Sequence, residues 1–205
     1  RSNETRYTDW PSFVEWVQAQ NGKATIANVS KDLPVFSTTL EYENLKTLIA
    51  DHKRVYPQKY RSNVQAWRSD WFTHKKDPRF QEFVDVCTQA CNFLSANHFK
   101  AECSLVCSNM WVVDYEKGDW TKDHDHFPDV MSCVYFVDVE ENCAPIIFED
   151  QLKIQPKNNL LIFFPSLLRH KVPPTDSKRI VISMNFRLAA AIPNIEYTNG
   201  LGGIN

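Results

Sequence analysis

Glycine is scarce in this sequence, with only five residues in a chain of 205. Gly22 and Gly118 stand alone, and the other three glycines lie near the C-terminal end. A turn that cradles a phosphate or a dinucleotide needs several closely spaced glycines between a strand and a helix. The sequence therefore excludes the kinase, P-loop and Rossmann classes together.

An excess of charge of one sign and long apolar runs are also lacking. The formal net charge is −2 at pH 7, which gives no reason to expect nucleic acid or an acidic membrane surface as a partner. No apolar run approaches the ~20 residues that a membrane-spanning helix needs. We therefore expect neither a nucleic-acid partner nor a membrane partner.

Cysteine is present, but not in a metal-binding pattern. The chain has six cysteines, and the pairs Cys87/Cys91 and Cys103/Cys107 have a spacing that does not suit a zinc knuckle. We expect these residues to be reduced and mostly buried thiols in a cytoplasmic protein.

The order of the patterns along the chain predicts the fold class. A chain of 205 residues is expected to form a single domain, residues 1–205, with a substantial core. Helical patterns dominate residues 8–98, strand patterns follow from about 100 to 188, and an irregular tail is expected at 189–205. Helices before strands favour an α+β fold with the helices packed on one sheet, and short, regularly spaced strands indicate a barrel or jelly roll.

The helical half has one strong start signal. Asp77 can cap a helix whose first position is Pro78, and the apolar side chains then recur at helical spacing. Residues 57–76 show no clear period. The elements expected here are a helix from Asp9 to Gly22, strands at 24–29 and 33–36, a helix capped by Thr38 or Thr39 and ending before Pro57, and a helix from Asp77 to Asn97.

The strand half contains six apolar segments that are separated by polar turns. Residues with high strand propensity dominate these segments. The expected strands are Glu102–Tyr115, Ser132–Val139, Pro145–Phe148, Leu152–Ile154, Asn159–Phe164 and Arg179–Leu188.

Three histidines in this half have the spacing of a metal site built on strands. In an extended backbone, residues i and i+2 point to the same face, so His124 and His126 can bind one ion while Asp125 points away. His170 follows in a later strand-like segment and can return to the same place. We therefore predict that His124, His126 and His170 bind one metal ion.

A nearby arginine suggests an anionic ligand beside this metal. Arg179 begins a buried strand, and alternation places Arg179, Val181, Ser183 and Asn185 on one face and the intervening apolar residues on the other. A guanidinium forms two parallel hydrogen bonds with a carboxylate. Arg179 is therefore a candidate carboxylate-binding residue.

Together these features resemble the iron(II)- and 2-oxoglutarate-dependent oxygenases. The shared pattern comprises His-x-His, the apolar strand 132–137, the turn Phe164-Pro165-Ser166, the distal His170 and Arg179. Within that family the chain is most similar to small prolyl-4-hydroxylase-like proteins, including phage-encoded members with a His-x-His motif. The likeness is strongest over 109–186 and weaker over 61–80.

The resemblance implies a double-stranded β-helix, or jelly roll, that binds iron(II), 2-oxoglutarate and O2, with ascorbate as an additive in vitro. It implies hydroxylation of a C–H bond, with release of succinate and CO2. A prolyl residue in a peptide or protein is the favoured substrate, and a small-molecule substrate is left open. A phage-encoded member would act in the host cytoplasm.

The resemblance also assigns roles to individual residues. Arg179 would pair with the distal carboxylate of 2-oxoglutarate. The family usually has a carboxylate where His126 stands, so Asp125 remains the alternative ligand at that position. The candidates for hydrogen bonds to 2-oxoglutarate are Tyr135, Asn109, Tyr115 and Ser183, and the aromatic residues that line a substrate pocket or belong to the core are Trp67, Trp111, Trp120 and Phe127.

Two other functions fit parts of the pattern. A cupin-like dioxygenase with three histidines on iron would need no 2-oxoglutarate, although Arg179 argues against it. A non-catalytic jelly-roll binding module would bind no metal.

Overall fold

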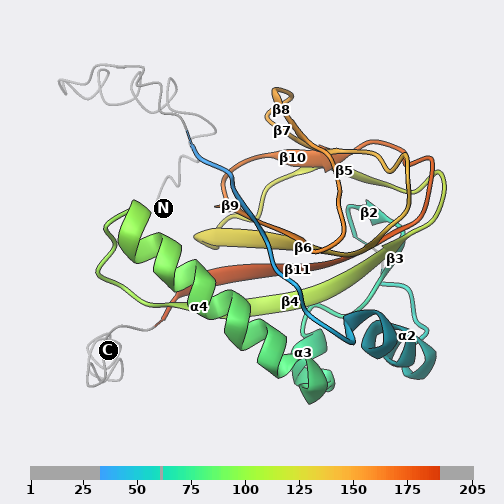
Figure 1. The fold of residues 1–205 in the computed structure, drawn as a ribbon, viewed down its shortest axis with the longest axis horizontal. Helices are drawn as coiled ribbons and strands as arrows, with labels where there is room; N and C mark the ends of the chain where they lie inside the picture. Colours follow the sequence, from blue (N-terminus) through green and yellow to red (C-terminus); the bar gives the residue numbers. More distant parts are fainter. Residues whose placement is uncertain (1–32, 61, 190–205) are drawn as a thin grey trace, which may run out of the picture. The chain divides into compact units, whose positions relative to one another are not determined.

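The computed structural model of this protein describes residues 33–60 and 62–189, which form two antiparallel sheets (Figure 1). The larger sheet contains, in spatial order, β1 (Phe36–Thr39), β9 (Leu160–Pro165), β6 (Met131–Val139), β11 (Arg179–Leu188), β4 (Leu105–Tyr115) and β3 (Trp67–Arg68). The smaller sheet contains β2 (Val64–Gln65), β5 (Trp120–His124), β10 (His170–Val172), β7 (Ile146–Phe148) and β8 (Leu152–Ile154). Two antiparallel sheets joined in this way form a jelly roll.

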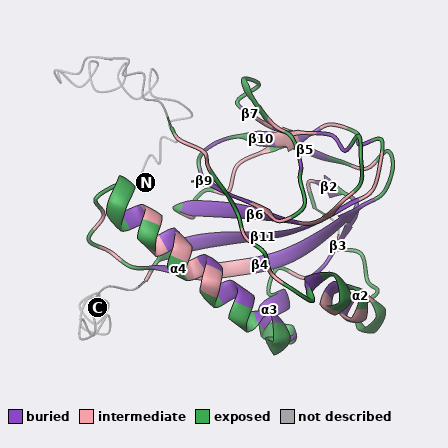
Figure 2. Cartoon of the chain, in the orientation of Figure 1, coloured by how far each residue is buried: buried purple, intermediate pink, exposed green. Residues whose placement is uncertain are grey.

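The helices lie on the outer face of the larger sheet. Helix α4 (Gln81–His98) crosses that face, and α2 (Leu45–Val55) and α3 (Thr73–Lys76) lie near its N-terminal end (Figure 1). The 3-10 helix η1 (Pro78–Phe80) leads into α4. Along α4, buried and exposed residues alternate at helical spacing (Figure 2), because one side of the helix packs on the sheet.

Alternation along the larger sheet divides the apolar side chains between two cores. In β11, Ile180, Ile182 and Met184 belong to the core beneath α4, whereas Val181 belongs to the core between the two sheets. We call these the helix-side core and the inter-sheet core. The predicted alternation of this strand is confirmed. The helix-side core also contains Phe83 and Cys87 of α4, and the inter-sheet core also contains Phe148 and Val172 of the smaller sheet.

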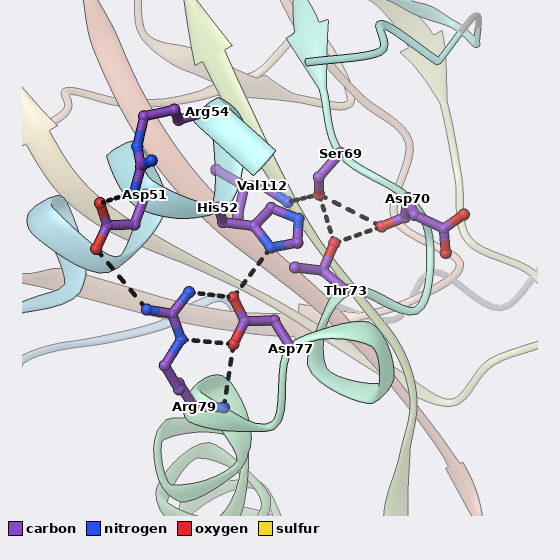
Figure 3. Close-up of polar contacts among 9 residues, drawn as sticks. All are labelled: Asp51, His52, Arg54, Ser69, Asp70, Thr73, Asp77, Arg79 and Val112. Atoms are coloured by element: carbon purple, nitrogen blue, oxygen red, sulfur yellow. Dashed lines mark hydrogen bonds and ion pairs between the residues drawn. The ribbon is translucent and has the colours of Figure 1, made fainter. Parts of the chain in front are cut away.

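A buried polar network fastens α2 to the beginning of α4 (Figure 3). His52 is 1% exposed, and its Nδ1 lies 3.2 Å from Oδ2 of Asp77. The guanidinium of Arg79 donates to both oxygens of Asp77, at 2.8 and 2.7 Å. Asp77 also accepts the main-chain N–H of Arg79 at 3.3 Å, so the predicted start signal is confirmed.

Most of the predicted strands are confirmed to within a few residues. The sequence did not delimit β2, β3, β5 or β10, each of which is short. The helix predicted at residues 9–22 and the strand predicted at 24–29 lie outside the described residues.

The predicted start of the second helix is wrong. Thr38 and Thr39 lie in β1, where they pair with Leu161 and Leu160 of β9, and α2 begins only after Asn44, which has a φ of 68°. Pairing along the edge of the sheet outweighs the local capping preference of the two threonines. The predicted strand at 33–36 is accordingly displaced to Phe36–Thr39, whereas the predicted end of α2 before Pro57 is confirmed.

All six cysteines are free, and Cys87, Cys91, Cys133 and Cys143 are buried, as predicted for reduced thiols. Among the described residues, no helix combines the length and the apolar composition that crossing a membrane requires.

Candidate metal centre

Two of the three histidines lie opposite each other on neighbouring strands of the smaller sheet. His124 is the last residue of β5, His170 is the first residue of β10, and the two are direct partners in the antiparallel register. Residues paired in this way project to the same face of a sheet. His126 lies two residues past the end of β5, and its main-chain N–H donates to the Ser166 carbonyl at 2.8 Å. The prediction that a single strand presents both His124 and His126 is therefore wrong, because the second histidine is held by the turn after β9.

The three imidazole rings nevertheless converge. One ring nitrogen from each histidine lies within 4.8 Å of the other two. The ring centroids of His124 and His170 are 4.3 Å apart, and His126 is 4.9 Å from each of them. The Nε2 atoms of His126 and His170 are 3.3 Å apart. This arrangement is suited to one metal ion with three nitrogen ligands.

Hydrogen bonds determine which ring nitrogen of His124 and of His170 is free to bind a metal. Nδ1 of His124 lies 2.8 Å from the Lys122 carbonyl, and Nδ1 of His170 lies 3.0 Å from the Leu168 carbonyl. A carbonyl only accepts, so Nδ1 must carry the hydrogen in both rings. The lone pair of each neutral ring is then on Nε2, which faces the site.

Burial keeps these imidazoles neutral. It lowers the pKa of His126 to about 2 and that of His170 to about 3, and it lowers the pKa of His124 as well. The mutual repulsion of neighbouring imidazolium charges acts in the same direction. Neutral imidazole is the form that binds a metal, so the site requires no deprotonation at neutral pH.

Asn185 supports the third histidine. Its Nδ2 lies 3.5 Å from Nδ1 of His126, and its Oδ1 accepts a hydrogen bond from Ser132 Oγ at 2.8 Å. The two ends of an amide are interchangeable by rotation, and the rotated amide would accept the Nδ1 hydrogen of His126. Alternation placed Asn185 on the correct face, but the sequence did not reveal this contact.

Asp125 does not join the histidine cluster. Its Oδ1 accepts the main-chain N–H of Phe127 at 3.1 Å, and its Oδ2 lies 3.4 Å from Arg169 Nη1. Asp125 turns toward Arg169, which also donates to Asp123 at 2.7 Å. The cluster of the described residues therefore consists of His124, His126 and His170.

A cavity of about 300 Å³ between the sheets is lined by all three histidines and by Arg179. Arg179 is 2% exposed, and its guanidinium carbon lies 4.6 Å from the centre of the Tyr115 ring. Nη1 donates to the Ala144 carbonyl at 2.6 Å, but Nε has no partner among the described residues. A buried cation with an unfilled donor beside three metal-binding nitrogens is suited to an anionic ligand.

The other predicted cosubstrate contacts divide into two groups. Tyr115 and Ser183 line the cavity, and the Tyr115 hydroxyl lies 2.6 Å from Thr121 Oγ1. Tyr135 lies instead in the helix-side core, where its hydroxyl is 2.8 Å from the Leu40 carbonyl and 3.0 Å from Asn159 Oδ1. Asn109 lines a neighbouring hollow that also contacts His126. The structure therefore places Tyr135 and Asn109 outside the cavity.

The four aromatic candidates are also separated. Trp111 lines the cavity, and its ring lies 5.6 Å from that of His126. Trp67 belongs to the helix-side core, whereas Trp120 and Phe127 are 39% and 71% exposed. Trp71, which the sequence did not single out, also lines the cavity and contacts Trp111 at 4.7 Å.

Comparison by sequence finds no relative, since neither a family model nor a curated protein matches the chain. Solved structures do match. A prolyl-4-hydroxylase from Pseudomonas putida is 14% identical with a TM-score of 0.58, over 75% of this chain and 91% of that one. A viral collagen prolyl hydroxylase from Paramecium Bursaria Chlorella virus-1, in complex with 2-oxoglutarate, is 17% identical with a TM-score of 0.54, over 76% of this chain and 96% of that one.

A third match is a prolyl hydroxylase from Trichoplax adhaerens, in complex with a peptide fragment of the hypoxia inducible factor oxygen degradation domain. It is 14% identical with a TM-score of 0.56, over 76% of this chain and 83% of that one. At these identities the likeness establishes the fold, and it confirms the predicted jelly-roll class. The chain has the fold of the prolyl hydroxylases, and its three-histidine cluster lies in a cavity between the two sheets.

Proposed function

We propose that this protein is an iron(II)- and 2-oxoglutarate-dependent oxygenase that hydroxylates a C–H bond, with a prolyl residue of a peptide as the substrate. The observation that carries the proposal is that three neutral imidazoles and a buried arginine share one cavity. The fold of the prolyl hydroxylases supports the reaction type. The peptide in the Trichoplax adhaerens structure supports the substrate class.

The residues of the cavity fit the two groups that this reaction needs. Nε2 of each histidine would hold iron(II), and three protein ligands leave positions for a bidentate 2-oxo acid and oxygen. Arg179 would hold the distal carboxylate of 2-oxoglutarate through the donor that the protein leaves unfilled. Tyr115 and Ser183 are close enough to the cavity to orient the cosubstrate.

The bound groups would supply the oxidative chemistry, in which one atom of O2 is incorporated into succinate as 2-oxoglutarate loses CO2 and the other is inserted into the substrate C–H bond. The protein supplies position and a dry environment. Val113, Val134, Phe136 and Ile146 line the cavity with apolar surface, which excludes water and strengthens the pairing of Arg179 with a carboxylate.

The free thiols support a reducing compartment, so we place the protein in the cytoplasm, or in the host cytoplasm if a phage encodes it. This placement is tested by the localisation of tagged protein in the producing cell.

The function is tested in two steps with the purified chain. Iron(II) and then 2-oxoglutarate are added without oxygen, and the absorption band of the iron complex with the 2-oxo acid is followed. Succinate is then measured after oxygen is admitted, with iron(II), 2-oxoglutarate and ascorbate, with and without prolyl peptides. We expect the band to appear and prolyl peptides to increase succinate formation.

Each failure has a distinct meaning. Iron binding without the 2-oxoglutarate band would favour a three-histidine dioxygenase of the cupin type. Absence of metal binding would favour a non-catalytic binding module. A 2-oxoglutarate band with no response to prolyl peptides would retain the oxygenase and overturn the prolyl substrate.

A further inference from the structure

Arg68 is a second buried cation without a counter-ion. It is 1% exposed, and its Nε and Nη1 have no hydrogen-bond partner among the described residues. No carboxylate of the described residues forms an ion pair with it. Burial lowers the pKa of Arg68, and the nearby Asp70 and Tyr60 offset this effect only in part. A buried guanidinium with unfilled donors is costly unless a ligand completes it.

The acidic residue nearest in sequence cannot complete it. The carboxylate of Asp70 accepts the main-chain N–H of Phe72 at 2.8 Å and the ammonium of Lys76 at 2.9 Å. The Asp70 carbonyl is held on the opposite side by the hydroxyls of Ser69 and Thr73 (Figure 3). The turn is therefore fixed with the Asp70 carboxylate engaged elsewhere.

Arg68 lies on the cavity face of the larger sheet. In the β3–β4 register it is opposite Val113, which lines the cavity, and directly paired residues project to the same face. Its neighbour Trp67 is opposite Asp114 and belongs to the helix-side core, as alternation requires. Arg68 thus lies on the same face of the larger sheet as Arg179, although Arg179 lines the cavity and Arg68 does not.

An aromatic wall links Arg68 to the metal centre. The Arg68 guanidinium carbon lies 4.0 Å from the centre of the Trp71 ring. Trp71 contacts Trp111 at 4.7 Å, and Trp111 lies 5.6 Å from His126. Both tryptophans line the cavity. A planar or apolar molecule on this wall would extend from the metal centre toward Arg68.

The two buried arginines lie on opposite sides of the same strand. Arg68 is level with Val113 of β4, and Arg179 is level with Tyr115. Two strand spacings separate their backbones, which is roughly 10 Å across the sheet. Arg179 lines the cavity directly, whereas Arg68 lies behind the Trp71 ring, which lines it. Displacement of the Trp71 indole would therefore add a second cation to the cavity, enough for two anionic groups.

We propose that Arg68 binds a carboxylate of the prime substrate, so that the substrate of this enzyme is an acid whose reacting carbon lies along the Trp71–Trp111 wall. This inference rests on the proposed function, in which Arg179 is assigned to 2-oxoglutarate. Trp71 covers Arg68 and must turn aside. Its main chain is held by the Met110 N–H at 2.9 Å, but its side chain is 37% exposed, so a rotation of the indole would uncover Arg68 without moving the backbone.

The experiment uses two matched pairs of probes: phenylacetate with phenylacetamide, and N-acetylproline with N-acetylprolinamide. Each is titrated into the full chain loaded with manganese(II) and 2-oxoglutarate without oxygen, and tryptophan fluorescence reports the displacement of Trp71. We expect each acid to bind at least tenfold more tightly than its neutral amide.

Three variants test whether Arg68 is the residue that favours the acid over its neutral amide. Arg68→Met should abolish the preference for the acid, and Arg68→Lys should retain part of it, because the charge remains but the planar fork is lost. Arg54→Met, at an exposed arginine of α2, is the matched control and should behave as wild type. Affinity for 2-oxoglutarate should be unchanged in all three variants and should fall in Arg179→Ala.

Arg68→Met should also fold, because it replaces an unpaired buried cation by an apolar side chain of similar length. If it does not, Arg68→Lys and the wild-type comparison of acid with amide decide the matter. Equal binding of acid and amide by the wild type, or an acid preference that survives in Arg68→Met, would refute the inference. So would a loss of 2-oxoglutarate affinity in Arg68→Met, which would make Arg68 the cosubstrate anchor.

Failure of the proposed function gives a different result. If the wild type does not bind 2-oxoglutarate at all, the oxygenase assignment is wrong, and the acid preference is then measured on the metal-loaded chain alone. If only the phenylacetate pair shows the preference, Arg68 remains the carboxylate site and the prolyl substrate is withdrawn.

Discussion

At the scale of single residues, the proposed function assigns the carboxylate of the 2-oxo acid to Arg179. A buried, charge-assisted hydrogen bond contributes about 1.5–3 kcal/mol, so Arg179→Ala should weaken 2-oxoglutarate binding by roughly ten- to a hundredfold. Arg179→Lys should give an intermediate affinity, because the ammonium cannot form the paired hydrogen bonds. The titration is followed by the absorption band of the anaerobic iron complex. Metal affinity should be unchanged, and an unchanged 2-oxoglutarate affinity would move the anchor to another residue.

The amide of Asn185 should matter for the metal without touching it. Groups that hydrogen-bond a metal-binding histidine typically change metal affinity by roughly ten- to a hundredfold when they are removed. Asn185→Ala should therefore weaken zinc or manganese binding by about that factor, measured by competition with a chelator. Asn109→Ala is the control, since Asn109 is opposite Asn185 in the sheet register and makes no hydrogen bond to His126. Equal losses in the two variants would contradict a specific role for Asn185.

The buried histidines should make the metal-free protein sensitive to acid. Their pKa values in the folded state lie below the ordinary value of 6.5, at about 3 for His170 and about 2 for His126. Above pH 6.5 neither state binds the proton. Below it the unfolded chain does and the folded chain does not, so the free energy of unfolding should fall by up to about 1.4 kcal/mol per pH unit for each such histidine.

Urea unfolding between pH 7.5 and 5 measures this slope. The slope should be smaller in His170→Asn, which removes one of the contributing groups, and unchanged in His98→Asn, which alters an exposed residue at the end of α4. A slope in His170→Asn equal to that of the wild type would show that acid sensitivity has another source.

The placement of the site residues could be predicted where polar and apolar residues alternate along a strand, because alternation shows which face of the sheet each residue occupies. Alternation in β11 placed Arg179 and Ser183 on the face that lines the cavity, because polar and apolar residues alternate there. Alternation could not show which face Tyr135 occupies. Residues 131–136 of β6 are buried on both faces, so polar and apolar residues do not alternate there. Asn109 was a candidate from the resemblance alone; it pairs with Asn185 in the β4–β11 register and lines a neighbouring hollow.

At the scale of elements, Asp77 holds the helices together. Its carboxylate caps η1 and is the partner of buried His52, so Asp77→Ala should lower the free energy of unfolding by about 1–3 kcal/mol. Asp85→Ala is the control, because Asp85 lies on the exposed side of α4 and, among the described residues, its side chain bonds only that of Gln81. Thermal and urea unfolding give the comparison. Metal affinity should stay at the wild-type value, since the network lies on the helix side of the larger sheet.

Elements with strong local signals were predicted well, and elements that depend on partners were not. Asp77-Pro78 defines the start of η1 by itself, and its position was correct. The threonines before α2 belong to an edge strand only because β9 is there to pair with them. Strands β5 and β10 are equally dependent on each other, since each is short and is defined by the pairing that joins His124 to His170.

At the scale of the whole molecule, the metal site should be separable from folding. His124 and His170 lie at the ends of strands, and both cores are already filled by apolar side chains. His170→Ala should therefore remove most of the bound metal while far-ultraviolet circular dichroism stays that of the wild type. Loss of the folded spectrum together with the metal would show that the ion is structural.

The two cores also differ in their content of sulfur-containing side chains. All three methionines, Met110, Met131 and Met184, lie in the helix-side core with Cys87, Cys91 and Cys133, whereas no sulfur atom occurs in the inter-sheet core of the described residues. Burial raises the pKa of Cys91 to about 12, so its thiol stays protonated and poorly reactive. The backbone of the larger sheet stands between these oxidisable atoms and the metal centre.

In an enzyme that activates oxygen, this separation would protect the sulfur atoms of the helix-side core from oxidants formed at the metal. When such a site turns over without its substrate, the oxidant attacks the protein that surrounds it. Here the nearest targets would be Trp111 and Trp71, which line the cavity, and the thioethers behind the sheet would be spared. If the proposed function is correct, mass spectrometry after prolonged turnover without substrate should find added oxygen on the cavity tryptophans and unmodified Met110, Met131 and Met184, because oxidation would reach the cavity wall before the helix-side core.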